Sequence, residues 1–317
     1  GWQLAMRSEN VYVPYDAKRI LAQGATNING PHQGGLVDTP TGEWWFMHFQ
    51  DKGAYGRIVH LQPVRWMDGW PVAGINPKIY CGEPALAHKK PNVGQNYPAE
   101  TPQESDEFDS NRLGLQWQWH ANPKQAWALP SASGYLRMYG QYYPENRTNL
   151  WNVPNLLLQK FTAPAFTATA KVSAVLHNDG DRAGYIVMGR DYSSVALVRK
   201  ADGYVFEQTV CRDAEHGNRE MKTLEIPLQN LHVDKRLNDQ TPIHEILFYF
   251  RVTVADGASC TFSYSVDGKR FEPAGQPFRA QQGMWTGAKT GFFIMNENNN
   301  SRRSWMDVDW FRIENNK

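Results

Sequence analysis

Short runs of alternating polar and apolar residues, separated by glycine-containing turns, constrain the fold of this chain more than any other feature. The clearest stretch reads N-G-P-H-Q-G-G-L-V-D-T-P-T-G-E-W-W-F-M-H-F-Q-D-K-G-A-Y-G-R and covers residues 29–57. Four such runs lie at 36–38, 44–50, 57–62 and 70–72, and turns at 39–42, 51–56 and 67–69 separate them. Alternation with a period of two predicts half-buried strands. We therefore expect a four-stranded antiparallel meander, the unit that forms one blade of a β-propeller.

The residues before this meander predict part of another blade. Runs at 2–7 and 18–22 have strand character, and the segment 10–15 between them has turn character. A propeller closes with roughly four to eight blades, and residues 1–75 supply about one and a half. We expect this part of the chain to need further blades, either from a preceding segment or from a companion chain.

The residues from 113 to 317 predict a different all-β domain. Alternating runs recur throughout it, and almost no stretch shows a helical period; clear examples lie at 166–175, 183–188, 195–199, 204–210, 244–254, 261–266 and 307–313. Many short strands with turn signals between them are typical of a two-sheet sandwich. Between 76 and 112 the alternation fades and proline, asparagine and acidic residues dominate, which predicts an interdomain linker.

Composition limits the classes of partner. The formal net charge is only +1, so nothing indicates binding to nucleic acid or to an anionic membrane. No run of 18 or more apolar residues is present, so no transmembrane helix is expected. The three cysteines, Cys81, Cys211 and Cys260, are odd in number and widely spaced, and we expect free thiols. No targeting segment is recognisable, and a cytoplasmic, periplasmic or secreted location stays open.

Several motifs resemble glycoside hydrolase family 43. In the first part they are G-W-Q-L-A-M-R-S-E-N-V-Y-V-P-Y, N-I-N-G-P-H-Q-G-G, G-A-Y-G-R and R-W-M-D-G-W-P-V-A-G. In the second part L-G-L-Q-W-Q-W-H-A-N-P, S-V-D-G-K-R-F, W-T-G-A-K-T-G-F-F and D-V-D-W-F-R-I are similar to the C-terminal domain of its β-xylosidase and α-L-arabinofuranosidase branch. The resemblance implies an all-β chain in which the last one to two blades of a five-bladed propeller precede a concanavalin-like jelly roll.

The resemblance implies that the catalytic groups are absent from this sequence. Family 43 enzymes invert the anomeric configuration with an Asp base, a Glu acid and a second Asp, and these map upstream of Gly1. The carboxylates near the meander, Asp38, Glu43, Asp51 and Asp68, all border turns and have local explanations. We expect no catalytic residue here, and an inactive chain on its own.

Two residues of the first part are candidates for substrate binding. His32 lies in a glycine-rich loop where no strand period explains an imidazole. The matching family histidine lies on the propeller axis, often near calcium. The resemblance therefore implies a metal site at His32, with calcium as a structural ion. Because calcium prefers six to eight oxygen ligands, one histidine would contribute only weakly to its binding. Arg57 ends G-A-Y-G-R, and its guanidinium suits sugar hydroxyls or a carboxylate. His48 and His60 fit blade packing better.

The second part offers one further candidate. Trp285 precedes T-G-A, where an aromatic residue of related β-xylosidases closes one side of the pocket; the other tryptophans fit packing better. The polar loops 178–181 and 296–300 lack the alternating oxygen pattern of a calcium loop, and turn chemistry explains them.

Two functions stay open at this point. The first is a family 43 glycosidase part, acting on xylo-oligosaccharides or arabinoxylan. Here Arg57, His32 and Trp285 bind an oligosaccharide, and the acid and base come from a missing N-terminal segment or companion chain. The alternative is a non-catalytic protein whose sandwich binds xylan.

Overall fold

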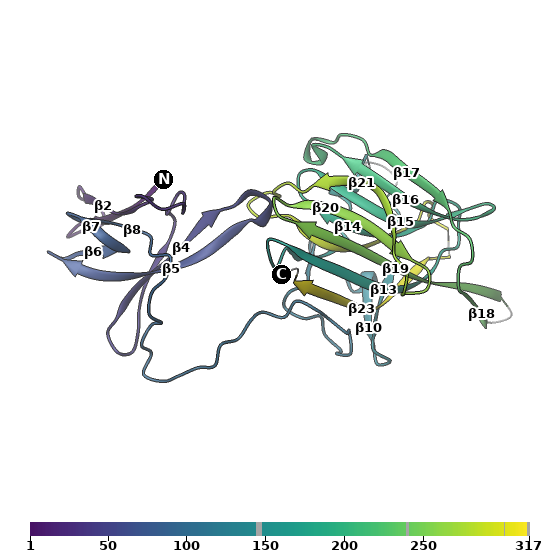
Figure 1. Cartoon of the computed structure of the whole chain (residues 1–317), viewed down its shortest axis with the longest axis horizontal. Helices are drawn as coiled ribbons and strands as arrows, with labels where there is room; N and C mark the ends of the chain where they lie inside the picture. Colours follow the sequence, from purple (N-terminus) through teal and green to yellow (C-terminus); the bar gives the residue numbers. More distant parts are fainter. Residues whose placement is uncertain (144–147, 239–240, 301, 316–317) are drawn as a thin grey trace. The chain divides into compact units, whose positions relative to one another are not determined.

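The computed structural model describes residues 1–143, 148–238, 241–300 and 302–315. The chain divides into two compact units, Gly1–Glu100 and Thr101–Lys317, and both consist largely of strands (Figure 1). The helices of the described residues are short 3-10 turns: η1 (Gly53–Tyr55), η2 (Gln125–Trp127), η3 (Leu150–Asn152) and η4 (Ala214–His216). None of these described helices is long and apolar enough to cross a membrane. The all-β prediction is confirmed.

The first unit contains two four-stranded sheets. The first sheet has the order β1-β2-β8-β7 and the second has the order β3-β4-β5-β6. Their strands are β1 (Trp2–Arg7), β2 (Asp16–Ala22), β3 (Gly35–Asp38), β4 (Trp44–Asp51), β5 (Arg57–Met67), β6 (Trp70–Ala73), β7 (Ile75–Lys78) and β8 (Cys81–Glu83). The second sheet is the predicted meander in its predicted chain order.

The structure divides the segment 76–112 between the two units. Strand β8 pairs in parallel with β2 through Leu21 and Gly82, which completes the first sheet. At the other end, Asp106 and Phe311 exchange two backbone hydrogen bonds of 2.7 and 2.8 Å, which ties Asp106 to the sandwich. The division between the two units, at Glu100 and Thr101, falls within the predicted linker, and both ends of that segment pair with strands. The proline-rich, acidic composition of this segment does not predict the pairing of β8 or of Asp106, because backbone groups, and not side chains, make these contacts.

The two sheets of the first unit pack together through a small core and leave other apolar residues exposed. Leu21 and Ala73 meet Phe46 and Val64 between the sheets. Because side chains alternate along a strand, the residues of β4 next to Phe46 point to the opposite face. That face is apolar and open to solvent; its exposed residues include Val37, Met47 and Val59, and those of β1 are Trp2, Leu4 and Met6.

The second unit is a two-layer sandwich (Figure 1). The seven-stranded sheet has the order β17-β16-β15-β14-β22-β12-β9, and the eight-stranded sheet has the order β10-β11-β23-β13-β19-β20-β21 with β18 added at β19. The strands of the first of these sheets are β9 (Gln118–Trp119), β12 (Leu157–Lys160), β14 (Arg182–Met188), β15 (Tyr192–Lys200), β16 (Gly203–Cys211), β17 (Met221–Pro227) and β22 (Lys289–Met295). Those of the second are β10 (Ala128–Ser131), β11 (Tyr135–Tyr139), β13 (Phe166–Val175), β18 (Val233–Asn238), β19 (Thr241–Ala255), β20 (Ser259–Ser265), β21 (Glu272–Arg279) and β23 (Trp305–Asn315).

The loop 178–181 connects the two sheets and is not a hairpin turn. It joins β13 of one sheet to β14 of the other. Its Asp181 is fully buried, and the carboxylate accepts hydrogen bonds from the backbone of Asn178 at 2.9 Å, the Ser304 hydroxyl at 2.6 Å and the backbone of Glu297 at 2.8 Å. The residues of this loop therefore predicted a turn. They did not predict that the Asp181 carboxylate connects the turn to the loop at 296–300 by a hydrogen bond.

Both faces of the central strands β14, β15 and β16 of the seven-stranded sheet are largely buried. The inner face of this sheet meets the eight-stranded sheet in an aromatic core, in which Tyr185 contacts Phe250 and Phe206 contacts Phe248 at ring distances of 6.5 and 6.0 Å. Its outer face is covered by the apolar side chains of residues 150–156, which pack in one cluster with β14, β15 and β16. In a sandwich without such a cover, this outer face of the sheet would be open to solvent.

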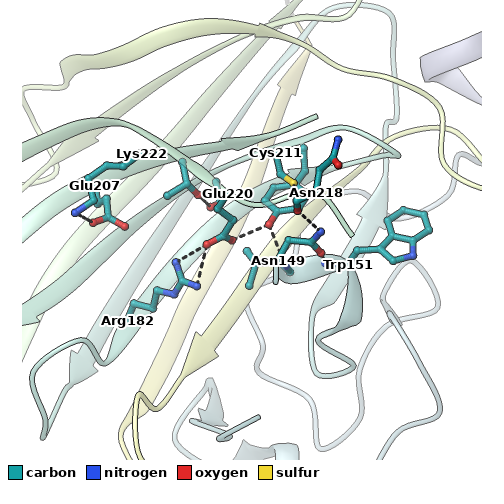
Figure 2. Close-up of polar contacts among 12 residues, drawn as sticks. Asn149, Trp151, Arg182, Glu207, Cys211, Asn218, Glu220 and Lys222 are labelled. Atoms are coloured by element: carbon teal, nitrogen blue, oxygen red, sulfur yellow. Dashed lines mark hydrogen bonds and ion pairs between the residues drawn. The ribbon is translucent and has the colours of Figure 1, made fainter. Parts of the chain in front are cut away.

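A buried polar network holds the cover in place (Figure 2). Both terminal nitrogens of Arg182 donate to Glu220, at 3.3 and 3.2 Å. The Tyr192 hydroxyl donates to the same carboxylate at 2.7 Å and accepts from the Leu150 backbone at 2.7 Å. Burial, followed by the charge of Glu220, raises the pKa of the Tyr192 phenol far above its usual value, so the phenol stays protonated as a donor. The side-chain amide of Asn149 donates to the carbonyl of Asn218 at 2.7 Å.

We predict that Glu220→Gln lowers the free energy of unfolding of the sandwich by about 2–4 kcal/mol, because it leaves the Arg182 guanidinium without its carboxylate in a poorly hydrated site. The matched control is Glu225→Gln. Glu225 also pairs with a basic side chain, that of Lys222, but it is more accessible to solvent, and the loss of its charge is expected to cost less than about 1 kcal/mol. Urea unfolding followed by circular dichroism measures both, and equal losses would contradict the prediction.

Candidate functional site

The loop between β2 and β3 places His32 by close backbone packing. Gly30 adopts a φ of 53°, a left-handed conformation that favours glycine. At Gly34 an added Cβ would lie 2.2 Å from the Met47 carbonyl oxygen, so only glycine fits against β4. The Asn29 side chain donates to the Asp51 carbonyl at 3.2 Å. These contacts fix the loop against the β4–β5 hairpin.

The structure brings His32 and Arg57 to the same aromatic ring. The His32 ring meets Phe49 edge-on, with centroids 5.2 Å apart and an interplanar angle of 90°. The guanidinium carbon of Arg57 lies 4.4 Å from the centroid of the same ring. Phe49 and Arg57 lie on the same side of the β4–β5 hairpin because Asp51 pairs with Arg57 and Phe49 with Val59. We call His32, Phe49 and Arg57 the His–Phe–Arg cluster.

Phe49 is the residue that sequence reasoning missed. The signal was present in the hairpin register: the turn at 51–56 aligns Asp51 with Arg57, which puts Phe49 two residues away on the face of Arg57. An arginine above an aromatic ring is held electrostatically by the negative ring face. The N–H donors of a guanidinium lie in its plane, where they suit hydroxyl or carboxylate oxygens.

The cluster offers little to a metal ion by itself. The Nδ1 atom of His32 is buried, and it has no hydrogen-bond partner in the part of the chain that the structure describes. Within the same residues, no group of three or more His, Cys, Asp or Glu side chains is arranged to hold a metal. Calcium requires six to eight oxygen ligands, so the residues present do not fit a calcium ion on their own. The calcium site stays a prediction.

His48 and His60 belong to a polar ladder on the opposite face of the same hairpin. Their rings stack at a centroid distance of 5.4 Å. His48 Nε2 lies 3.2 Å from Gln62 Nε2, and His60 Nε2 lies 3.2 Å from Gln50 Oε1. Burial lowers the pKa of both histidines below the usual value. They therefore pack between the sheets of the first unit as neutral hydrogen-bonding groups.

Three carboxylates of the first unit serve local structure. Asp51 accepts from the Gly53 backbone at 3.1 Å within its turn. Glu43 accepts from Lys89 and from the Asn92 backbone, both at 2.8 Å, and these contacts lower its pKa. Asp68 accepts from the Tyr80 hydroxyl at 2.6 Å. These roles agree with the turn and surface functions that the sequence favoured.

Trp285 lies in the second unit, in the loop between β21 and β22. The residue has a φ of 61° and is 71% exposed. A left-handed backbone is strained for a bulky residue, at a cost on the order of 1–3 kcal/mol. The neighbouring Met284 and Thr286 line a cavity of about 180 Å³ together with His120. Strain combined with exposure is typical of a residue kept for contact with another molecule.

The three cysteines are free thiols, as the sequence predicted, with Cys211 and Cys260 buried. Of the tryptophans assigned to packing, Trp45, Trp70 and Trp117 are buried. Trp66 is 47% exposed, which differs from the expectation of blade packing, although it lies on the same face of the sheet as Phe46 and its ring meets Trp44 edge-on.

The two units match two family models, both of which belong to glycosyl hydrolases, a class of carbohydrate-active proteins. The model of glycosyl hydrolases family 43 matches residues 3–71, and that of the β-xylosidase C-terminal concanavalin A-like domain matches residues 105–314. The chain belongs to glycoside hydrolase family 43. The family prediction and the assignment of a partial propeller with a concanavalin-like sandwich are confirmed.

The relatives are longer than this chain. A putative β-xylosidase of Xylanibacter ruminicola is 35% identical over 92% of the chain and 50% of its own length. A β-xylosidase of Formosa agariphila is 30% identical over 98% of the chain and 53% of its own length. The solved structure of a bifunctional GH43-CE protein of Bacteroides eggerthii has a TM-score of 0.74 and 28% identity over 99% of the chain and 37% of that protein. The chain thus spans about half the length of the curated relatives it matches.

We predict opposite titration shifts for two histidines of this chain. His48 should titrate below about 6.5 because burial disfavours its charged form, and exposed His216 should titrate above it because Asp213 accepts its hydrogen bond. Two-dimensional proton–nitrogen NMR of the imidazoles measures both, and a normal value for His48 would contradict its burial. The His48 side chain binds a proton more readily in the unfolded chain than in the folded one. The free energy of unfolding that neutral His48 contributes is therefore fully present above about pH 6.5, and it is lost as the pH falls below that value.

Proposed function

We propose that this chain is the C-terminal part of an inverting glycosidase that removes β-D-xylosyl or α-L-arabinofuranosyl units from arabinoxylan or xylo-oligosaccharides. The observation that carries the proposal is the His–Phe–Arg cluster, in which His32 and Arg57, distant in sequence, contact one ring. Membership of family 43 gives the reaction class, and the printed names of two curated relatives favour xylosides as substrates.

The cluster would bind the sugar rather than break the bond. Arg57 offers planar N–H donors to sugar hydroxyls or to a neighbouring carboxylate, and its guanidinium carbon lies 4.4 Å from the centroid of the Phe49 ring. His32 adds an imidazole whose ring is oriented by the same phenylalanine. Groups held in advance lose little conformational freedom when the substrate binds.

The acid and base would come from propeller blades outside this sequence. Inversion needs two carboxyl groups roughly 6.5–9.5 Å apart, one to protonate the leaving oxygen and one to activate water. The carboxylates Glu43, Asp51 and Asp68 are engaged in the local contacts described above. Further blades would also cover the exposed apolar residues of the first unit, whose exposure to water is unfavourable.

Two further parts of the proposal concern Trp285 and calcium. Exposed Trp285 would form one wall of the substrate pocket, for which its strained backbone and its exposure give support. A calcium ion near His32 would need its oxygen ligands from water and from residues beyond those described. We propose it only as a structural ion and assign it no step in the reaction.

The alternative, a xylan-binding protein without catalysis, gains no support from the broad face of the sandwich. Its seven-stranded sheet carries an apolar cover on the outer face of β14, β15 and β16, so the centre of that face is not open to a ligand. Binding elsewhere on the sandwich is compatible with either function.

We predict that the purified chain releases no 4-nitrophenol from 4-nitrophenyl β-D-xylopyranoside or α-L-arabinofuranoside. Co-expression with the N-terminal half of the Xylanibacter ruminicola relative should produce a complex on size exclusion and restore release, because that half would supply the carboxylates and cover the apolar faces. Release by the chain alone would contradict the placement of the acid and base. A stable 36 kDa monomer that binds xylan and gains no activity would support the alternative.

We predict that Arg57→Ala lowers kcat/KM of the reconstituted enzyme by about 10- to 100-fold, the effect of losing hydrogen bonds from a charged group. Arg57→Lys should recover only part of this, because an ammonium lacks the planar fork. Arg65→Ala is the matched control, since Arg65 is an exposed arginine on the same strand β5. Equal kinetics for Arg57→Ala and Arg65→Ala would overturn the role of Arg57.

A further inference from the structure

A polar groove lies along one edge of the sandwich, within the second unit. It has a volume of about 390 Å³ and is bordered by residues 102–104, 115, 116, 118 and 159–162. This volume falls within the roughly 300–1,000 Å³ of small-molecule sites. The groove contains part of the motif L-G-L-Q-W-Q-W-H, whose glutamines had no role in the function proposed above.

The groove collects polar atoms that lack partners. Seven buried side-chain nitrogen or oxygen atoms of the described residues have no hydrogen-bond partner, and three of them belong to groove residues: Gln116 Oε1, Gln159 Oε1 and Thr162 Oγ1. Gln159 itself is only 2% exposed. Buried polar groups in folded proteins nearly always have a partner, which the protein, an ordered water or a ligand supplies, so three such atoms mark this groove as a polar surface suited to binding.

The orientation of both amides is fixed by their nitrogen atoms. Gln159 Nε2 donates to the Glu104 carbonyl at 3.0 Å, and Gln116 Nε2 donates to Asp106 at 3.2 Å. Each amide therefore presents its carbonyl oxygen as the remaining acceptor. The matching ligand group is a hydrogen-bond donor.

The remaining residues select a neutral ligand that is polar on one side and apolar on the other. The Thr162 hydroxyl can both donate and accept, and Lys160 adds a donor. Phe161 borders the groove, and Leu115 is fully exposed at its margin. Sugar rings carry hydroxyl groups around the ring and C–H groups on their faces, which matches amides and a hydroxyl beside apolar side chains.

We propose that this groove binds a neutral oligosaccharide, a segment of the xylan main chain, through Gln116, Gln159 and Thr162. The choice of xylan rests on the proposed function, whereas the groove and its lone atoms do not. The sandwich would then hold the polymer as well as complete the enzyme. Such a contact raises the local concentration of chain ends near the reacting site without taking part in the chemistry.

The test is isothermal titration calorimetry of the full chain with xylohexaose. We expect binding, and we expect Thr162→Val and Gln159→Leu each to weaken it by about three- to ten-fold, the effect of one net hydrogen bond. Thr261→Val and Gln141→Leu are the matched controls, because both positions lie outside the groove lining, and they should change affinity by less than two-fold.

Circular dichroism melting checks that each variant folds. Thr162→Val keeps the shape of the side chain, so it decides the question if Gln159→Leu does not fold. No binding of xylohexaose by the chain, or equal affinity in the wild type and Thr162→Val, would overturn the proposal. These results do not depend on hydrolysis, so failure here leaves the glycosidase proposal intact, and loss of nitrophenol release leaves the groove intact.

Discussion

A β-sheet with apolar side chains on both faces needs a cover on each face, and the rest of this structure depends on that constraint. In the sandwich the seven-stranded sheet meets the aromatic core on one side and residues 150–156 on the other. The second cover is secured by charge as well as by packing, because Glu220 binds Arg182 and Tyr192, and Tyr192 binds the backbone of Leu150. Where the covers are complete, the surface left for a ligand is at the sheet edge and in loops.

The same constraint gives the first unit its character. Its two sheets cover each other through Phe46 and Leu21, but Met47, Val59 and Leu4 remain exposed. A ring of blades solves this problem because each blade covers its neighbours. The His–Phe–Arg cluster lies at the end of one such open face, since Phe49 and Val59 pair across β4 and β5. In our proposal, the same further blades cover the exposed apolar residues of the first unit and supply the catalytic carboxylates beside the His–Phe–Arg cluster.

Strand positions were predictable wherever local alternation is strong. The meander of the second sheet and β13 agree with the structure because alternate side chains there face a core and solvent in turn. The segment 76–112 was not predictable in this way: β8 joins β2, and Asp106 joins Phe311, through backbone groups that leave no pattern in the side chains. In the same way, Asp181 was predicted as part of a turn, but its burial under Ser304 and Glu297 depends on residues more than a hundred positions away.

The sequence by itself determined an all-β chain, the two kinds of sheet architecture, the family, and His32, Arg57 and Trp285 as candidates. It could do so because strand period, turn chemistry and motifs are local. Only the tertiary structure decided that Phe49 joins His32 to Arg57, that the broad face of the sandwich is covered, and that Gln116, Gln159 and Thr162 line one groove. Those facts are distances between residues far apart in the chain, and packing and backbone pairing set them.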